Sequence, residues 1–142
     1  MALSLTNIDI GAAPDDGTGD PARTAFGHVN TNNGAIETAV NAWIGTLYVE
    51  TVADQDYVLS YDMPFAGTIT ALRTKTQSGT CTVTGKIGST ALGGTANSAT
   101  STASSQSHSS DNAFSIGDTV KITVSANSAA LSLEVTFSGV KS

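Results

Sequence analysis

Charged side chains are scarce in this sequence of 142 residues. They make up 13% of the chain, against roughly 25% in an average globular domain, so hydroxyl-bearing and small side chains must cover much of the surface. Acidic residues outnumber basic ones and give a net charge of −6. The basic residues are scattered and form no stripe that could follow a phosphate backbone. We therefore expect no nucleic-acid partner.

Cysteine is almost absent, and so are long apolar runs. A single cysteine, Cys81, excludes an internal disulfide and a thiolate metal cluster within one chain. It alternates with Val83 and Ile87 in "TCTVTGKI", which predicts a small buried residue. The N-terminus has neither the basic segment nor the apolar run of a signal peptide, and no later run could span a bilayer. We expect a soluble protein, made in a cytoplasm, without a membrane partner.

Proline is also rare, and its absence between Pro21 and Pro64 leaves room for a helix over residues 21–47. Asp20 suits the N-cap and Pro21 the first helical position, where no N–H is needed. The preceding glycines suit a tight turn, and acidic residues beside a helix N-terminus complement its dipole. The predicted helix-initiating turn consists of Asp16, Gly17, Gly19, Asp20 and Pro21.

Apolar residues recur along this expected helix at alternating steps of three and four. Such heptad spacing predicts a parallel left-handed coiled coil between copies of the chain. Asn33 occupies one core position, where it would set the register at a cost in stability. The alternative is an amphipathic helix lying on its own sheet, which Gly27 and Gly34 favour. The predicted core residues are Ala22, Phe26, Val29, Asn33, Ile36, Val40, Trp43 and Leu47.

Residues 1–20 form an irregular arm whose apolar residues do not keep a constant period. With little of its own surface to bury, this arm should become ordered only by docking on another surface. The residues expected to dock are Leu3, Leu5, Ile8 and Ile10.

Residues 48–142 alternate with the period of strands, and turn residues recur at intervals of about 8–12, which is typical of an antiparallel sandwich. The segments "GDTVKITVS" and "LSLEVTFSGV" are predicted to be two strong strands, and a tight hairpin at "ANSA" should join them. The hydroxyl-rich stretch from Thr95 to Phe114 is interpreted as one or two edge strands with a loop, rather than as a disordered linker, and its edge could face a sister subunit. The residues expected to point inward are Val120, Ile122, Val124, Leu131, Leu133, Val135 and Phe137.

Patterns that carry catalysis or bind metals are not met. "DDGTGD" lacks the spacing of a calcium loop, and no Lys-Ser or Lys-Thr pair follows it as in a phosphate loop. His28 and His108 are expected on the surface, without an acid partner nearby in sequence. The only plausible carboxylate cluster, Asp54, Asp56 and Asp62, lies in turns. We expect no metal, no cofactor and no enzymatic activity.

The segment "IGAAPDDGTGDPARTAFGHVN" resembles the N-terminal segment of fibre and appendage proteins of tailed bacteriophages, in which a turn G-x-x-P-x-D-G-T-G-D-P precedes R-T-A-F and a helix. Residues from Pro64 to Phe137 resemble, more loosely, a jelly-roll-like β-domain of phage virion proteins. The resemblance implies a homotrimeric virion structural protein without catalysis. Its arm would dock on capsid, portal or tail components, and its β-domain would project outward.

The expected fold is therefore mainly β: an antiparallel jelly-roll-like β-sandwich preceded by an N-terminal arm and one α-helix that forms a trimeric bundle. Residues 1–20 would dock, residues 21–47 trimerise and residues 48–142 form the sandwich. A helix only about 40 Å long favours a head decoration or head fibre protein over a long tail fibre. The alternatives are a short tail fibre or receptor-binding protein that recognises a host glycan or protein and, with less support, a polysaccharide hydrolase.

Overall fold

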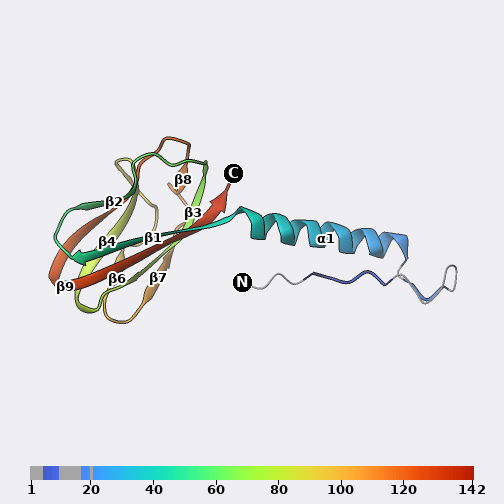
Figure 1. Cartoon of the computed structure of the whole chain (residues 1–142), viewed down its shortest axis with the longest axis horizontal. Helices are drawn as coiled ribbons and strands as arrows, with labels where there is room; N and C mark the ends of the chain where they lie inside the picture. Colours follow the sequence, from blue (N-terminus) through green and yellow to red (C-terminus); the bar gives the residue numbers. More distant parts are fainter. Residues whose placement is uncertain (1–4, 10–16, 20) are drawn as a thin grey trace. The chain divides into compact units, whose positions relative to one another are not determined.

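The chain divides into a helical unit, Met1–Asn41, and a β unit, Ala42–Ser142 (Figure 1). The computed structural model describes residues 5–9, 17–19 and 21–142. The helical unit contains α1 (Ala22–Asn41), and the β unit contains nine strands. These are β1 (Ala42–Thr51), β2 (Asp56–Ser60), β3 (Gly67–Lys75), β4 (Ser78–Ile87), β5 (Thr90–Ala91), β6 (Asn97–Ala99), β7 (Ser104–Ser107), β8 (Ala113–Phe114) and β9 (Val120–Lys141).

The helix begins where the sequence predicts and continues through Asn33 and Gly34 without a break. The amide of Ala25 donates to the carbonyl of Pro21 at 3.0 Å, which places Pro21 at the first turn. A Cβ atom added at Gly27 or Gly34 would meet no atom within 4 Å, so neither glycine is required by a close neighbour. Asp16 and Asp20 of the predicted turn lie outside the described residues.

The helix ends earlier than predicted, because the chain enters β1 at Ala42. Trp43 and Leu47 therefore belong to a strand, and their assignment to the coiled-coil core is wrong. Trp43 is buried, with its ring edge-on to Phe65 and Phe114 at centroid distances of 5.7 and 5.5 Å. Aromatic and β-branched residues pack well on a pleated sheet. We infer that burying this indole in the β unit stabilises the fold more than extending the helix along its heptad would.

The strands form one antiparallel sheet in which β9, 22 residues long, is central. The first half of β9 pairs with β2 and β4, and its second half pairs with β1 and β3. The predicted hairpin at "ANSA" is wrong: the same residues bend a single strand. Left-handed backbone conformations at Ala126, Ala129 and Ser132 lie at the bend, where the pairing with β4 also shifts register. Such bulges allow one strand to pass from one layer to the next.

Asn127 fastens this bend to the turn between β1 and β2. Its backbone amide donates to Asp54 Oδ1 at 2.9 Å, and its side-chain amide donates to the carbonyl of Val52 at 2.7 Å. Its Oδ1 accepts from the amide of Ala130 at 2.9 Å. Because the bend interrupts the alternation, Ala130 is buried and Leu131 is exposed. The expectation that Leu131 points inward is therefore wrong.

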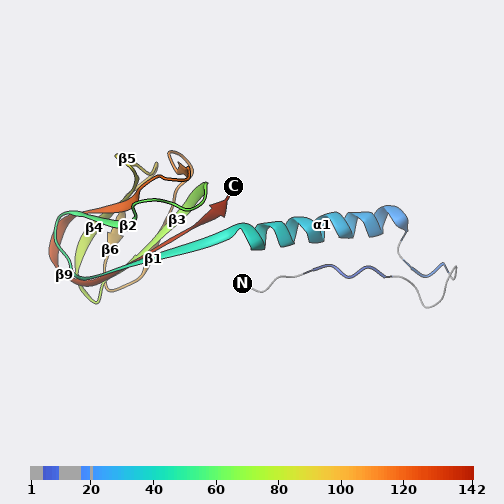
Figure 2. The same cartoon turned by 45° about the horizontal axis from the view of Figure 1, so that its top comes forward.

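The bend brings the two ends of β9 close together. The amide of Met63 donates to Asp118 just before β9, and the amide of Ser142 just after β9 donates to Ala66, both at 3.0 Å. Four residues, 63–66, thus bridge ends that a straight strand would separate by about 70 Å. The curl of β9 is visible in both views (Figures 1 and 2).

The folded sheet encloses one hydrophobic core. The mainly β, antiparallel character of the prediction is confirmed, as is the inward position of the remaining predicted residues of β9. The hydroxyl-rich stretch is ordered at the edges, because β6 pairs with β4 while β7 and β8 pair with β3. The largest fully buried apolar side chains are Phe137, Ile69, Leu72, Ile122 and Leu133.

Candidate functional site

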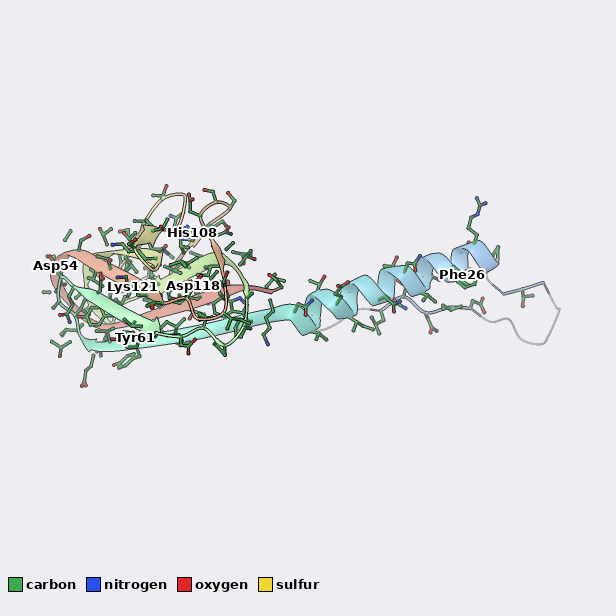
Figure 3. The ribbon with its side chains drawn as sticks, turned by 90° about the horizontal axis from the view of Figure 1, so that it is seen from above. Phe26, Asp54, Tyr61, His108, Asp118 and Lys121 are labelled. Atoms are coloured by element: carbon green, nitrogen blue, oxygen red, sulfur yellow. The ribbon has the colours of Figure 1, made fainter. Side chains whose placement is uncertain are left out.

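The helical unit exposes a line of large apolar side chains on α1. Phe26 and Val40 are 69% and 68% exposed, and Val29 and Ile36 are 38% and 41% exposed. Exposed Asn33 lies between them at the same spacing. Residues three and four apart share one face of a helix, so Phe26, Val29, Asn33, Ile36 and Val40 form a continuous surface, here called the apolar stripe. Figure 3 shows Phe26 on the outside of the helix.

A different side of α1 binds the N-terminal arm. The side-chain amide of Asn32 donates to the carbonyl of Thr6 at 2.8 Å, and its oxygen accepts from the amide of Thr6 at 2.7 Å. Asn32 is half-buried, and Ala25, His28 and Ala35, at helical spacing from it, are half-buried as well. The described residues of the arm, 5–9 and 17–19, thus leave the apolar stripe exposed.

Residues 5–9 therefore gain contacts within their own chain, whereas the sequence had led us to expect order only on an external surface. Ile8 is half-buried and Leu5 remains exposed. Leu3 and Ile10 lie outside the described residues. Gly17 has a φ of +70°, the left-handed conformation that glycine adopts freely, which agrees with a tight turn before the helix. Gly19 is half-buried and Pro21 is exposed.

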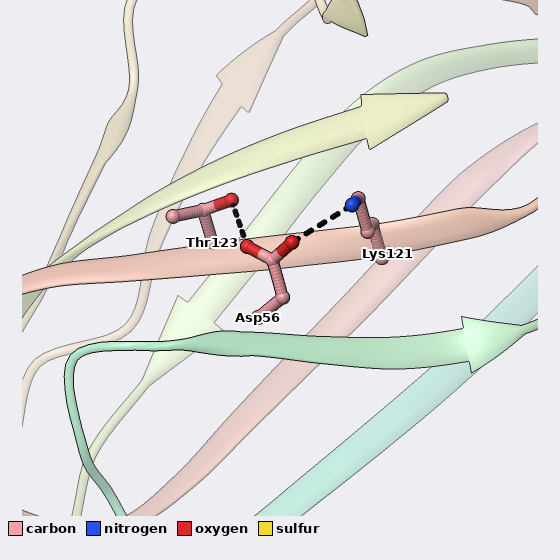
Figure 4. Close-up of polar contacts among 3 residues, drawn as sticks. All are labelled: Asp56, Lys121 and Thr123. Atoms are coloured by element: carbon pink, nitrogen blue, oxygen red, sulfur yellow. Dashed lines mark hydrogen bonds and ion pairs between the residues drawn. The ribbon is translucent and has the colours of Figure 1, made fainter. Parts of the chain in front are cut away.

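Two of the three carboxylates weighed as a catalytic cluster, Asp54 and Asp56, take part in structural contacts. Asp56 accepts hydrogen bonds from Lys121 Nζ at 2.7 Å and from the hydroxyl of Thr123, across the pairing of β2 with β9 (Figure 4). The bond from Lys121, with a smaller effect of Thr123, holds the pKa of the Asp56 carboxyl below its usual range. Asp54 accepts from the amide of Asn127 at the bend.

Two residues with reactive side chains, His108 and Cys81, are both buried in the β unit. His108 is buried, so its expected surface position is wrong; its Nδ1 donates to the carbonyl of Gly93 at 2.8 Å. Cys81 is buried as predicted, and burial, with a smaller effect of Asp54, raises the pKa of its thiol. Among the described residues, no three His, Cys, Asp or Glu side chains are grouped so that they could hold a metal ion.

The sequence predicts the apolar stripe as far as Val40, from the spacing and the type of its residues. It does not predict the bonds between Asn32 and Thr6, because an asparagine on a helix surface can have many other roles. Within the part of the chain that the structure describes, no helix is both long and apolar enough to cross a membrane. No protein-family model matches the chain, and no curated protein matches its sequence.

Proposed function

We propose that the chain is a homotrimeric structural protein of a tailed-bacteriophage virion, of the head decoration or head fibre type. The N-terminal arm docks it on capsid, portal or tail components, α1 joins three copies, and the β unit projects outward. The role is assembly rather than catalysis. The protein would be made in the host cytoplasm and end in the particle.

The observation that carries the proposal is the exposure of the apolar stripe. Isolated helices of this length are marginal in water, and most helices in proteins are stabilised by packing of an apolar face. In the single chain, Phe26 and Val40 leave about two thirds of their surface in water. Packing copies side by side would bury the stripe against itself, with Asn33 setting the register. The coiled-coil core is shorter than the sequence predicts, because α1 spans 20 residues, about 30 Å, instead of the expected length of about 40 Å.

A trimer is supported by the phage resemblance of the segment around the helix-initiating turn, since such proteins are typically homotrimers. The jelly-roll-like sandwich remains a prediction: the folded sheet encloses a core between two layers, as a sandwich does, but its hydrogen bonds form one sheet. The alternative is a short tail fibre or receptor-binding protein that recognises a host glycan or protein.

The mass of the full chain in solution tests the oligomeric part of the proposal. Sedimentation equilibrium should return three times the mass of the 14.3 kDa chain. A stable monomer at micromolar concentration would refute self-association.

Attachment to particles tests the docking part. A chain without residues 1–20 should keep the β unit folded and no longer attach. The control is Asn32→Ala, which removes the two bonds to Thr6 but keeps the arm and should still attach. If the shortened chain attaches as well as the full chain, the arm does not dock. Imaging of an intact particle then distinguishes a head position from a tail position.

A further inference from the structure

A polar hollow lies on the outer face of the β unit, over β3 and β9. It has a volume of about 250 Å³ and is lined by Arg73, Thr74, Lys75, Ala103, Glu134 and Thr136. A neighbouring hollow of about 210 Å³ shares Lys75 and Glu134 and extends to Gln77 and Ser132. Together they make an open, polar groove, here called the β3/β9 groove. All of its lining residues except Ala103 are polar or charged, whereas sites that enclose small molecules are lined mostly by apolar residues.

The pairing register places its side chains in rows across the sheet. Glu134 of β9 lies between Tyr48 of β1 and Lys75 of β3. In the next outward row, Thr136 lies between Thr46 and Arg73. Directly opposite residues have Cβ atoms about 4.5–5.5 Å apart. An aromatic ring, a carboxylate, hydroxyls and two cations therefore share one small area, and Tyr48 is 60% exposed there.

The charge of the groove is opposite to that of the protein. The chain has six basic residues and a net charge of −6, yet two of the six, Arg73 and Lys75, line this groove with a single carboxylate, Glu134. Two of the other three lysines have partners: Lys121 pairs with Asp56 at 2.7 Å, and Lys141 Nζ lies 5.0 Å from the centre of the Phe65 ring.

Arg73 and Lys75 stand two residues apart on the same face of β3 and make no ion pair within the described parts of the chain. With Glu134 as the single carboxylate beside these two cations, the groove keeps a net positive charge, which an anionic ligand would neutralise.

We propose that the β3/β9 groove binds an acidic saccharide. The planar guanidinium of Arg73 can hold a carboxylate or sulfate through two parallel hydrogen bonds, and Lys75 adds a second charge. Glu134 and Thr136 accept hydrogen bonds from sugar hydroxyls, and Tyr48 offers an amphipathic ring for the apolar face of a sugar. A free anion would use only the two cations, whereas a saccharide also uses Glu134, Thr136 and Tyr48. The binding does not rest on trimerisation, so a monomeric chain should bind as well per site.

Binding of the full chain to a panel of immobilised saccharides tests this inference. The panel contains uronate-bearing, sialylated and sulfated oligosaccharides, each with a neutral counterpart that lacks the acidic group. We expect retention on at least one acidic saccharide and none on its neutral counterpart, with affinity that falls as salt is raised. Failure to retain any acidic saccharide, or equal retention of the neutral counterparts, would overturn the proposal.

Variants assign the binding to the groove. Arg73→Gln with Lys75→Gln should lower the affinity for the retained saccharide at least tenfold. The matched control, Arg23→Gln with Lys86→Gln, removes the same charge from α1 and β4 and should leave the affinity within twofold. All four side chains are on helix or strand surfaces, and urea unfolding confirms that each variant is folded. Equal losses in both variants would show a general charge effect and overturn the site.

A third variant separates a saccharide from a free anion. Tyr48→Ala should weaken retention of the saccharide, while competition by inorganic sulfate or phosphate stays unchanged. If sulfate alone competes as well as the saccharide and Tyr48→Ala has no effect, the groove binds an anion and the saccharide assignment is wrong.

Discussion

Replacement of Phe26 by glutamine tests whether the apolar stripe holds copies of the chain together. A phenylalanine side chain buries about 150–250 Å² when it is fully covered. Since Phe26 is 69% exposed in the single chain, about 140 Å² remains to be buried by a partner. At about 25 cal/mol per Å² this corresponds to about 3.5 kcal/mol per chain, or about 10 kcal/mol for three chains. These values are upper limits, because association also costs translational, rotational and side-chain freedom.

Phe26→Gln should therefore convert a trimer into monomers at micromolar concentration, as measured by sedimentation equilibrium. The control is Thr24→Gln, which introduces the same side chain at an exposed position on the opposite side of α1. It should leave the mass unchanged. An unchanged mass for Phe26→Gln, with the unsubstituted chain still trimeric, would show that the copies meet through another surface and would refute the reasoning.

Four further predictions concern single residues. Gly27→Ala and Gly34→Ala should each stabilise the helix by about 1 kcal/mol, because both sites are open; circular dichroism melting checks this, and lower helicity would contradict it. Gly139→Ala should destabilise the β unit strongly in urea unfolding, since its Cβ would collide with the carbonyl oxygen of Thr68; an unchanged midpoint would contradict that close approach. The pKa of Asp56 is lowered in the folded chain, so its contribution is present above the pKa of the unfolded state and lost as pH falls through the folded pKa; Asp56→Asn should lower the urea midpoint at pH 7 but not in strong acid. The buried Cys81 thiol, with its raised pKa, should react with iodoacetamide only after unfolding, and fast labelling of the folded chain would count against its burial.

The apolar stripe was partly predictable from the sequence: the prediction holds as far as Val40 and fails at Trp43. Heptad spacing located the apolar stripe as far as Val40 because residues on one helix face follow a local period. It failed at Trp43, whose side chain packs against Phe65 and Phe114 in the β unit. The β3/β9 groove could not be predicted, because its residues come from strands distant in sequence and meet only through the pairing register.

The sequence by itself determined the local features: where α1 begins, the burial of Cys81, and the inward alternation of Val120, Ile122 and Val124. Each depends on neighbours a few residues away. Only the tertiary structure decided whether "ANSA" would be a hairpin or a bend. Asn127 bonds to Val52, 75 residues earlier in the chain, and those bonds curl β9 through the bend. A turn-like sequence is compatible with both outcomes, and distant hydrogen bonds and core packing select between them.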